Sequence, residues 1–148
     1  MNTVRHILEL RGGFTWTIDP QSSVYEALRL MSDKDVGALP VVQGERVIGL
    51  ISERDYARKV FLRGKSSKDT PVQDVMETDF PVVHPDQTVE ECMELMSKRR
   101  CRHLVVMEGE RMVGIISIGD VVRCIIYSQR QKLSQLEGFT LAAQLLAL

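Results

Sequence analysis

Two Ser-x-x-Asp motifs stand 65 residues apart in the chain: Ser52 with Asp55, and Ser117 with Asp120. An aspartate carboxylate can accept two hydrogen bonds at once, which suits the neighbouring 2′- and 3′-hydroxyls of a ribose. A serine hydroxyl beside the free N–H groups of a helix start suits a phosphate. The same spacing is also typical of a plain helix N-cap with an acid in the first turn. The spacing alone leaves both interpretations open, and one helix end can serve both.

A run of basic residues, Lys98–His103, is the second feature that could do chemistry. Such a run usually forms a solvated surface, although it would also suit an anion or RNA. The whole chain carries a formal net charge of -1. Because DNA-binding proteins are normally basic overall, we expect no DNA partner.

The remaining reactive residues form no recognisable catalytic or metal-binding set. His6, His84 and Cys101 have none of the spacing that structural zinc sites use. Cys101 lies beside Arg102, which could lower its thiol pKa, but no partner base is identifiable. His103 is expected to line a pocket or lie on the surface. The sequence therefore predicts no metal, no catalytic residue and no enzymatic activity.

The composition is that of an ordinary globular protein, with 44% hydrophobic and 26% charged residues among 148. No stretch approaches the roughly 20 apolar residues that span a bilayer, and the N-terminus lacks the layout of a signal peptide. The three cysteines, Cys92, Cys101 and Cys124, include no C-x-x-C and suggest free thiols in a reducing compartment. We expect a cytoplasmic protein that does not contact membranes.

The chain contains an internal repeat. A shift of 65 residues aligns 20–58 with 85–123 without a gap, and 16 of the 39 positions are identical. Both Ser-x-x-Asp motifs are among the matched positions. A repeat of this kind means that one structural unit occurs twice.

Each copy predicts the same order of elements. Short extended segments at 17–18 and 82–83 precede helices that start at Ser23-x-x-Glu26 and Thr88-x-x-Glu91, which have capping-box spacing. Two apolar runs joined by a Gly-containing turn then predict a hairpin in each copy. A second helix is predicted to begin at Ser52 and at Ser117.

This order predicts an α/β (α+β) fold built from two β-α-β-β-α repeats. About 60 residues are marginal for independent folding, so we expect the copies to pack together with pseudo-two-fold symmetry and paired clefts. The predicted parts are residues 1–68 (first repeat with an N-terminal segment and linker), 69–128 (second repeat) and 129–148 (helical tail). Gly138 is expected to interrupt the tail, whose apolar end is expected to pack on a partner subunit.

The hairpins and second helices resemble the CBS domain, named after cystathionine beta-synthase. The resemblance rests on residues 39–42 with 47–55, and on residues 102–106 with 113–120. It implies a tandem CBS pair in a small stand-alone protein. It also implies an adenine-nucleotide ligand, namely AMP, with NAD or NADH, ATP and S-adenosylmethionine as alternatives. CBS pairs commonly form dimers, so a homodimer is implied as well.

The resemblance further implies that each site mixes residues of both copies. Around one nucleotide we expect Ile18, Val36, Ala38, Ser117 and Asp120. Around a second nucleotide we expect Val83, Arg102, His103, Ser52 and Asp55. Arg102 would bind phosphate in the second site, whereas the small apolar surface of residues 36–38 suits an adenine ring in the first. The two sites should therefore differ.

The sequence thus predicts a regulatory nucleotide-binding module that signals to a separate effector protein whose identity stays unknown. A nucleotide hydrolase is one alternative, although the aspartates and glutamates of this chain are scattered and form no metal-binding cluster. A dimeric scaffold, or an RNA-binding protein without a nucleotide response, is another.

Overall fold

The computed structural model describes residues 2–147, with the backbone alone for residues 139–141. The first repeat contains α2, β1, β2 and α3, and α1 precedes it. The bounds are α1 (Val4–Arg11), α2 (Val24–Lys34), β1 (Ala38–Gln43), β2 (Arg46–Ser52) and α3 (Glu53–Tyr56), which a π-helical turn, Ala57–Phe61, extends. The second repeat contains a 3₁₀ turn (Val72–Asp74), β3 (Val82–Val83), α4 (Val89–Arg99), β4 (His103–Glu108), β5 (Arg111–Ser117) and α5 (Ile118–Leu146).

The two hairpins have the same register. β1 pairs antiparallel with β2, and Ala38 lies opposite Ser52. β4 pairs antiparallel with β5, and His103 lies opposite Ser117. β3 adds a parallel edge strand to the second hairpin. In the first repeat the expected edge strand is reduced to one bridge, from Ile18 to Val41. The predicted fold class is otherwise confirmed.

The predicted helix starts are also confirmed. Ser23 and Thr88 cap α2 and α4 through their side chains, and Thr88 forms a complete capping box with Glu91. Both helices end on a left-handed residue at equivalent positions, Asp35 with φ 54° and Arg100 with φ 51°. The tight turn that follows feeds directly into β1 or β4, so each hairpin starts at a defined point.

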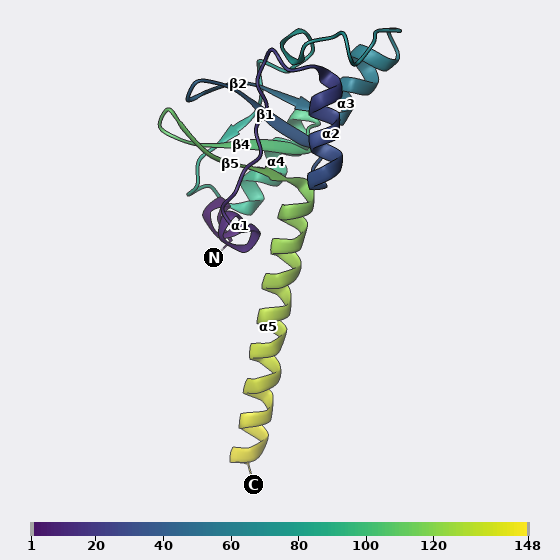
Figure 1. The fold of residues 1–148 in the computed structure, drawn as a ribbon. Helices are drawn as coiled ribbons and strands as arrows, with labels where there is room; N and C mark the ends of the chain where they lie inside the picture. The colour runs from purple at the N-terminus through teal and green to yellow at the C-terminus, as the bar shows by residue number, and fades with distance from the viewer. Residues whose placement is uncertain (1, 148) are drawn as a thin grey trace.

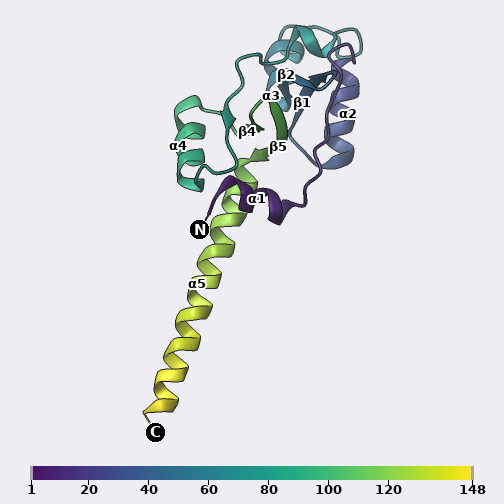
Figure 2. The ribbon, with the colours of Figure 1, turned by 90° about the vertical axis from the view of Figure 1, so that its left-hand side faces the viewer.

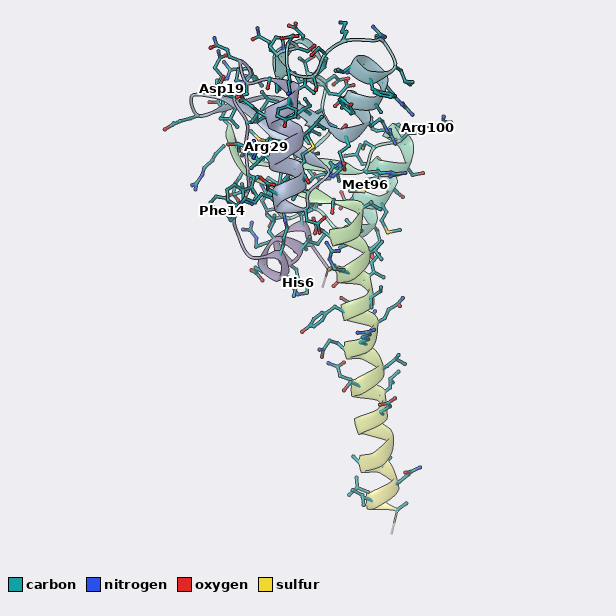
Figure 3. All side chains as sticks on the ribbon, turned by 45° about the vertical axis from the view of Figure 1, so that its right-hand side comes forward. His6, Phe14, Asp19, Arg29, Met96 and Arg100 are labelled. Carbon is teal, nitrogen blue, oxygen red and sulfur yellow. The ribbon has the colours of Figure 1, made fainter. Side chains whose placement is uncertain are left out.

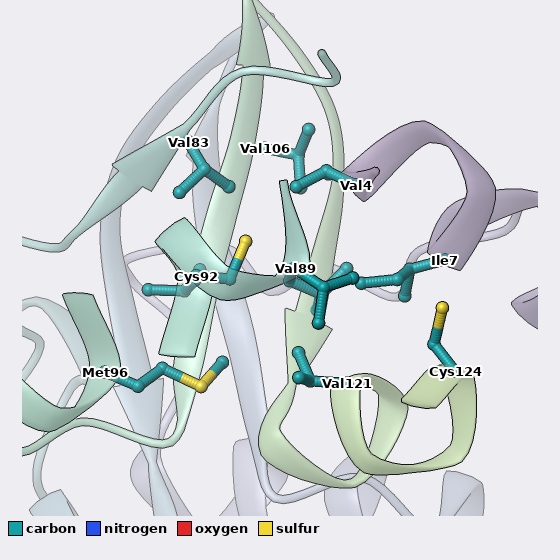
Figure 4. Packing of buried hydrophobic residues seen from close by; sticks show 11 residues of the cluster. Val4, Ile7, Val83, Val89, Cys92, Met96, Val106, Val121 and Cys124 are labelled. Carbon is teal, nitrogen blue, oxygen red and sulfur yellow. The ribbon is translucent and has the colours of Figure 1, made fainter. Parts of the chain in front are cut away.

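The leading segment of each repeat packs into the core of the other repeat. Val4 and Ile7 of α1 are buried with α4 and α5 of the second repeat (Figure 4). Val72 and Val75, which precede β3, are buried against the first repeat. The predicted boundaries at 68/69 and 128/129 stay predictions, and the core packing crosses the first of them.

The hairpins meet between the two repeats. A separate cluster there contains Ala38 and Leu50 from the first hairpin and Val105 and Ile115 from the second. Helices α2 and α4 lie on opposite outer sides of the hairpins (Figure 2). The molecule is therefore layered helix, hairpin, hairpin, helix, and the carboxyl ends of β2 and β5 lie close to this central contact.

Helix α5 extends far beyond the layered domain as a single rod (Figure 1). It continues through Gly138, so the predicted interruption is wrong. One glycine costs about 1 kcal/mol in a helix, and the neighbouring leucines, alanines and glutamines favour helix strongly enough to offset it. Within residues 2–147, no helix is both long enough and apolar enough to cross a membrane.

Gly49 of β2 should not tolerate alanine. An added Cβ would lie 2.5 Å from the Met76 sulfur and 3.2 Å from the backbone oxygen of Glu77, which accepts a hydrogen bond from Leu50 N. We expect Gly49→Ala to lower the free energy of unfolding by about 1–3 kcal/mol in urea titrations. The equivalent change Gly114→Ala should cost less, because its closest contact is the end of the half-buried Leu8 side chain at 2.9 Å. Equal costs would contradict this explanation.

Candidate functional site

The start of α5 places a carboxylate beside two arginines. Ser117 N donates to the Asp120 carboxylate at 2.8 Å, and Asp120 N donates to the Ser117 hydroxyl at 3.1 Å. Arg123 Nη2 lies 2.7 Å from Asp120 Oδ1, and Arg11 Nε lies 4.0 Å from Oδ2. Arg11 also donates to the backbone oxygen of Ile115. Asp120 therefore caps its helix and carries two cationic neighbours at once.

A cavity of about 260 Å³ opens beside this carboxylate, between the two repeats. We call it the Asp120 cavity. Its lining comprises Arg11, Asp35, Val36, Gly37, Ala38, His103, Ile115, Ile116, Ser117, Asp120 and Arg123. Four of the five residues expected around the first nucleotide line it. The fifth, Ile18, does not, because its bridge to Val41 packs it against the first repeat's core.

A smaller cavity of about 160 Å³ lies at the equivalent helix start in the first repeat. We call it the Ser52 cavity. Its lining comprises Gly37, Leu50, Ser52, Glu53, Arg54, Pro81, Cys101, Arg102 and His103. Ser52, Arg102 and His103 line it as expected. Val83 does not, because it is fully buried in the core of the second repeat.

Asp55, expected in the Ser52 cavity, is absent from its lining. Its carboxylate accepts from Ser52 N at 2.9 Å and lies 3.2 Å from Lys59 Nζ. The same ammonium group lies 2.8 Å from Glu77 and donates to the Val75 oxygen. Burial lowers the pKa of Lys59, but the hydrogen bond to Glu77 and the charge of Asp55 outweigh it and raise the pKa. Asp55 is thus held in an ion pair on the far side of its helix start.

His103 separates the two cavities and lines both. Gly37, which faces it, is also shared, and a Cβ there would lie 3.5 Å from the imidazole ring and 3.2 Å from Glu53. Burial lowers the pKa of His103 to about 4, although the charge of Asp120 acts in the opposite direction. The imidazole is therefore neutral at neutral pH.

The basic run is divided between several roles. Arg99 pairs with Asp79 at 3.6 Å, and the Arg100 oxygen accepts from Arg54 at 2.8 Å, which links the repeats. Figure 3 shows Arg100 on the outer side of the domain, at the end of α4. The idea that Arg102 lowers the thiol pKa of Cys101 is wrong, because burial outweighs the nearby arginines and raises that pKa.

Sequence reasoning missed Arg11 and Arg123 as site residues. The repeat could have pointed to Arg123, because Arg58 occupies the equivalent position in the first copy. Arg11 had none, because it precedes the repeated segment and reaches Asp120 only through the packing of α1. A third hollow, of about 1080 Å³, lies between the hairpin turns. Mostly exposed turn residues of both charges line it, so it offers no enclosed set of polar groups.

Comparison with known proteins matches the architecture to one family. The family model described as CBS domain matches residues 15–61 and 72–127. The chain therefore belongs to the CBS domain family, and it holds two copies of that domain, as the repeat predicts.

Several relatives resemble the chain over most of its length. It is 41% identical over 134 residues to the CBS domain-containing protein CBSX3, mitochondrial, of Arabidopsis thaliana, covering 86% of this chain and 64% of that protein. It is 44% identical to a solved protein with CBS domains from Burkholderia ambifaria MC40-6, with a TM-score of 0.83 over 86% of this chain and 96% of that one. A hexameric CBS-CP12 protein from bloom-forming cyanobacteria is 28% identical, with a TM-score of 0.71 over 81% and 70%. The chain thus spans less than two thirds of the plant relative.

The neutral state of His103 should make stability depend on pH. The unfolded chain takes up a proton near pH 6.5, whereas the folded chain keeps this imidazole neutral down to about pH 4. Falling pH across this window therefore favours the unfolded chain. One pKa unit corresponds to about 1.4 kcal/mol, so the loss should be on the order of 3 kcal/mol. Urea titrations from pH 7.5 to 4.5 should show this loss, and His103→Gln should remove it. Parallel curves for the two proteins would contradict the assignment.

Proposed function

We propose that the chain is a regulatory module that binds an adenine nucleotide, with AMP as the preferred ligand, in the Asp120 cavity. The observation that carries the proposal is the placement of Asp120 between Arg11 and Arg123, opposite a small apolar segment of the other repeat. Each part of a nucleoside monophosphate has a matching group in this cavity.

The base fits against the first repeat. Val36, Gly37 and Ala38 follow α2 and present small side chains and backbone groups to the cavity. An adenine ring can lie flat on such a surface and exchange hydrogen bonds with the backbone. Because Gly37 already approaches His103 closely, a larger residue would fill the space that the base needs.

The ribose and the phosphate fit the second repeat. The Asp120 carboxylate can accept from two neighbouring ribose hydroxyls. Arg11 and Arg123 supply positive charge for a phosphate, and the N-terminus of α5 adds the favourable end of its dipole. In the free protein these arginines neutralise Asp120. We propose that the nucleotide exchanges these contacts: the phosphate takes the arginines, and the ribose takes the carboxylate.

The cavity size favours a mononucleotide. At about 260 Å³, the Asp120 cavity lies just below the usual range for small-molecule sites, which begins at about 300 Å³. NAD or NADH, ATP and S-adenosylmethionine are the alternative ligands, and thermal unfolding can compare them with AMP. The Ser52 cavity contributes Ser52 and Arg102, but it is smaller, and the aspartate that matches Asp120 is held by Lys59 outside its lining, so we propose weaker binding there.

The proposed action is regulation by differential binding. Residues of both repeats line the Asp120 cavity, so a nucleotide favours one relative arrangement of the repeats over others. The Burkholderia relative is described as a signal-transduction protein, and we propose a comparable role here, acting on an effector protein and without catalysis. We also propose a homodimer and a cytoplasmic location.

Thermal unfolding with a panel of ligands tests the proposal. AMP at about 100 times its Kd should stabilise the chain by roughly 2.7 kcal/mol. AMP should bind on the order of 10- to 100-fold more tightly than adenosine, because charge-assisted hydrogen bonds to a phosphate contribute about 1.5–3 kcal/mol. Arg11→Gln with Arg123→Gln should abolish this preference and leave adenosine binding intact. If no ligand of the panel shifts the transition, the proposal fails.

Asp120→Asn and Asp55→Asn form a matched pair for locating the site. Both aspartates complete capping boxes at equivalent positions, but Asp120 lines the Asp120 cavity, whereas Asp55 lines neither of the two named cavities. Calorimetric titration should show AMP binding weakened at least about 10-fold by Asp120→Asn, since a charged acceptor is lost. Asp55→Asn should leave the affinity unchanged. The reverse order would move the site to the first repeat and contradict our assignment.

A further inference from the structure

Within the part of the chain that the structure describes, the outer half of α5 packs against no other element. The matched CBS segment ends at residue 127, and α5 continues to Leu146. Every side chain described between residues 129 and 147 is exposed. In Figure 3 the side chains along this half of the helix stand clear of the domain. Helices in proteins draw most of their stability from packing an apolar face, so a long helical extension of this kind favours a partner outside the chain.

An apolar stripe runs along α5 at alternating spacings of four and three. Val122, Ile126, Leu133 and Leu136 lie on it, and their exposed fractions are 45%, 43%, 58% and 63%. Gln129 fills the position between Ile126 and Leu133, and Ala143 continues the pattern seven residues after Leu136. Apolar residues that recur every 3.5 residues on average are typical of the contact line, or seam, of a coiled coil. The stripe therefore predicts that the partner is another helix.

The residues beside the stripe favour a second copy of the same helix, parallel and in register. In such a pair, the residue that directly precedes Leu133 on one helix faces the residue five positions later in the sequence on the partner helix. Lys132 and Glu137 occupy these two positions, so symmetry creates two attractive pairs. Gln129 would face its own copy, and two amides can exchange hydrogen bonds because each is donor and acceptor.

We propose that two chains associate through a parallel, in-register coiled coil formed by the stripe from Val122 to Ala143. This contact places both CBS pairs at the same end of the dimer. The inference gives the proposed homodimer its surface, and it does not depend on the nucleotide site. Its failure would therefore leave AMP binding untouched, and loss of AMP binding would leave the coiled coil untouched.

Cysteine cross-linking tests the orientation and the register. Disulfides need Cα atoms within about 4.4–6.8 Å, which facing seam positions of a parallel pair provide. Gln129→Cys and Leu136→Cys, made separately in the full chain, should each give a covalent dimer under mild oxidation. Gln135→Cys, which points away from the seam, should not, and the unaltered chain with its own three cysteines serves as the blank. An antiparallel pair could link at most one of the two seam positions, so dimers at one position alone, or at neither, would overturn the proposal.

Sedimentation equilibrium tests whether the stripe supplies the affinity. Leu133→Gln with Leu136→Gln should weaken the dimer on the order of 100-fold or more, because four buried leucines are lost from it. Leu145→Gln is the matched control, since Leu145 is 62% exposed and lies on the opposite face of the helix from Leu136. It should leave the dimer unchanged. Equal effects of the two changes, or no effect of the first, would overturn the proposal.

Discussion

The contact between the two hairpins determines where every other feature of the site lies. Ala38, Leu50, Val105 and Ile115 form a buried cluster there, two residues from each repeat. Because both hairpins have the same register, this contact brings the carboxyl ends of β2 and β5 to equivalent places on either side of it. Each strand end starts a helix with a Ser-x-x-Asp cap. The cavities are consequently shared between the repeats, and neither repeat could form one alone.

The same symmetry makes the differences between the cavities informative. Asp55 and Asp120 both complete a capping box at equivalent positions, yet their charges are balanced by different neighbours. Lys59 and Glu77 tie Asp55 into a network away from the Ser52 cavity, whereas Arg11 and Arg123 surround Asp120 at the edge of its own cavity. An ion pair that a ligand can replace with its own charges suits a binding site. An ion-pair network whose partners are all protein groups, such as the one around Asp55, stabilises the fold instead.

Local patterns explain what the sequence could predict. Ser52, Asp55, Ser117 and Asp120 were identified as helix caps because a cap depends on residues three positions apart. Apolar runs around Gly-containing turns predicted the two hairpins, and the resemblance to the CBS domain pointed to the family. Four of the five residues expected around the first nucleotide line one cavity, and their binding role stays a prediction. Ile18 and Val83, which the family resemblance implied for the two sites, line neither cavity because each packs against the core of its own repeat.

Long-range packing explains what the sequence could not predict. Val4 and Val72 each enter the core of the other repeat, and no local pattern specifies such an exchange. Arg11 reaches Asp120 only as a result of it. The role of Asp55 was missed for a similar reason, because Glu77, from a distant segment, orients Lys59. The predicted break at Gly138 was wrong because it considered the low helix propensity of one glycine without the strong helix formers on both sides.

A crystal structure of the chain grown with AMP would test the central claim most directly. We predict one nucleotide in the Asp120 cavity, with its base against Val36–Ala38, its ribose hydroxyls on Asp120, and its phosphate on Arg11 and Arg123. The arginines should have left the carboxylate. A nucleotide bound only in the Ser52 cavity, or one that leaves both arginines paired with Asp120, would contradict the proposed exchange of contacts.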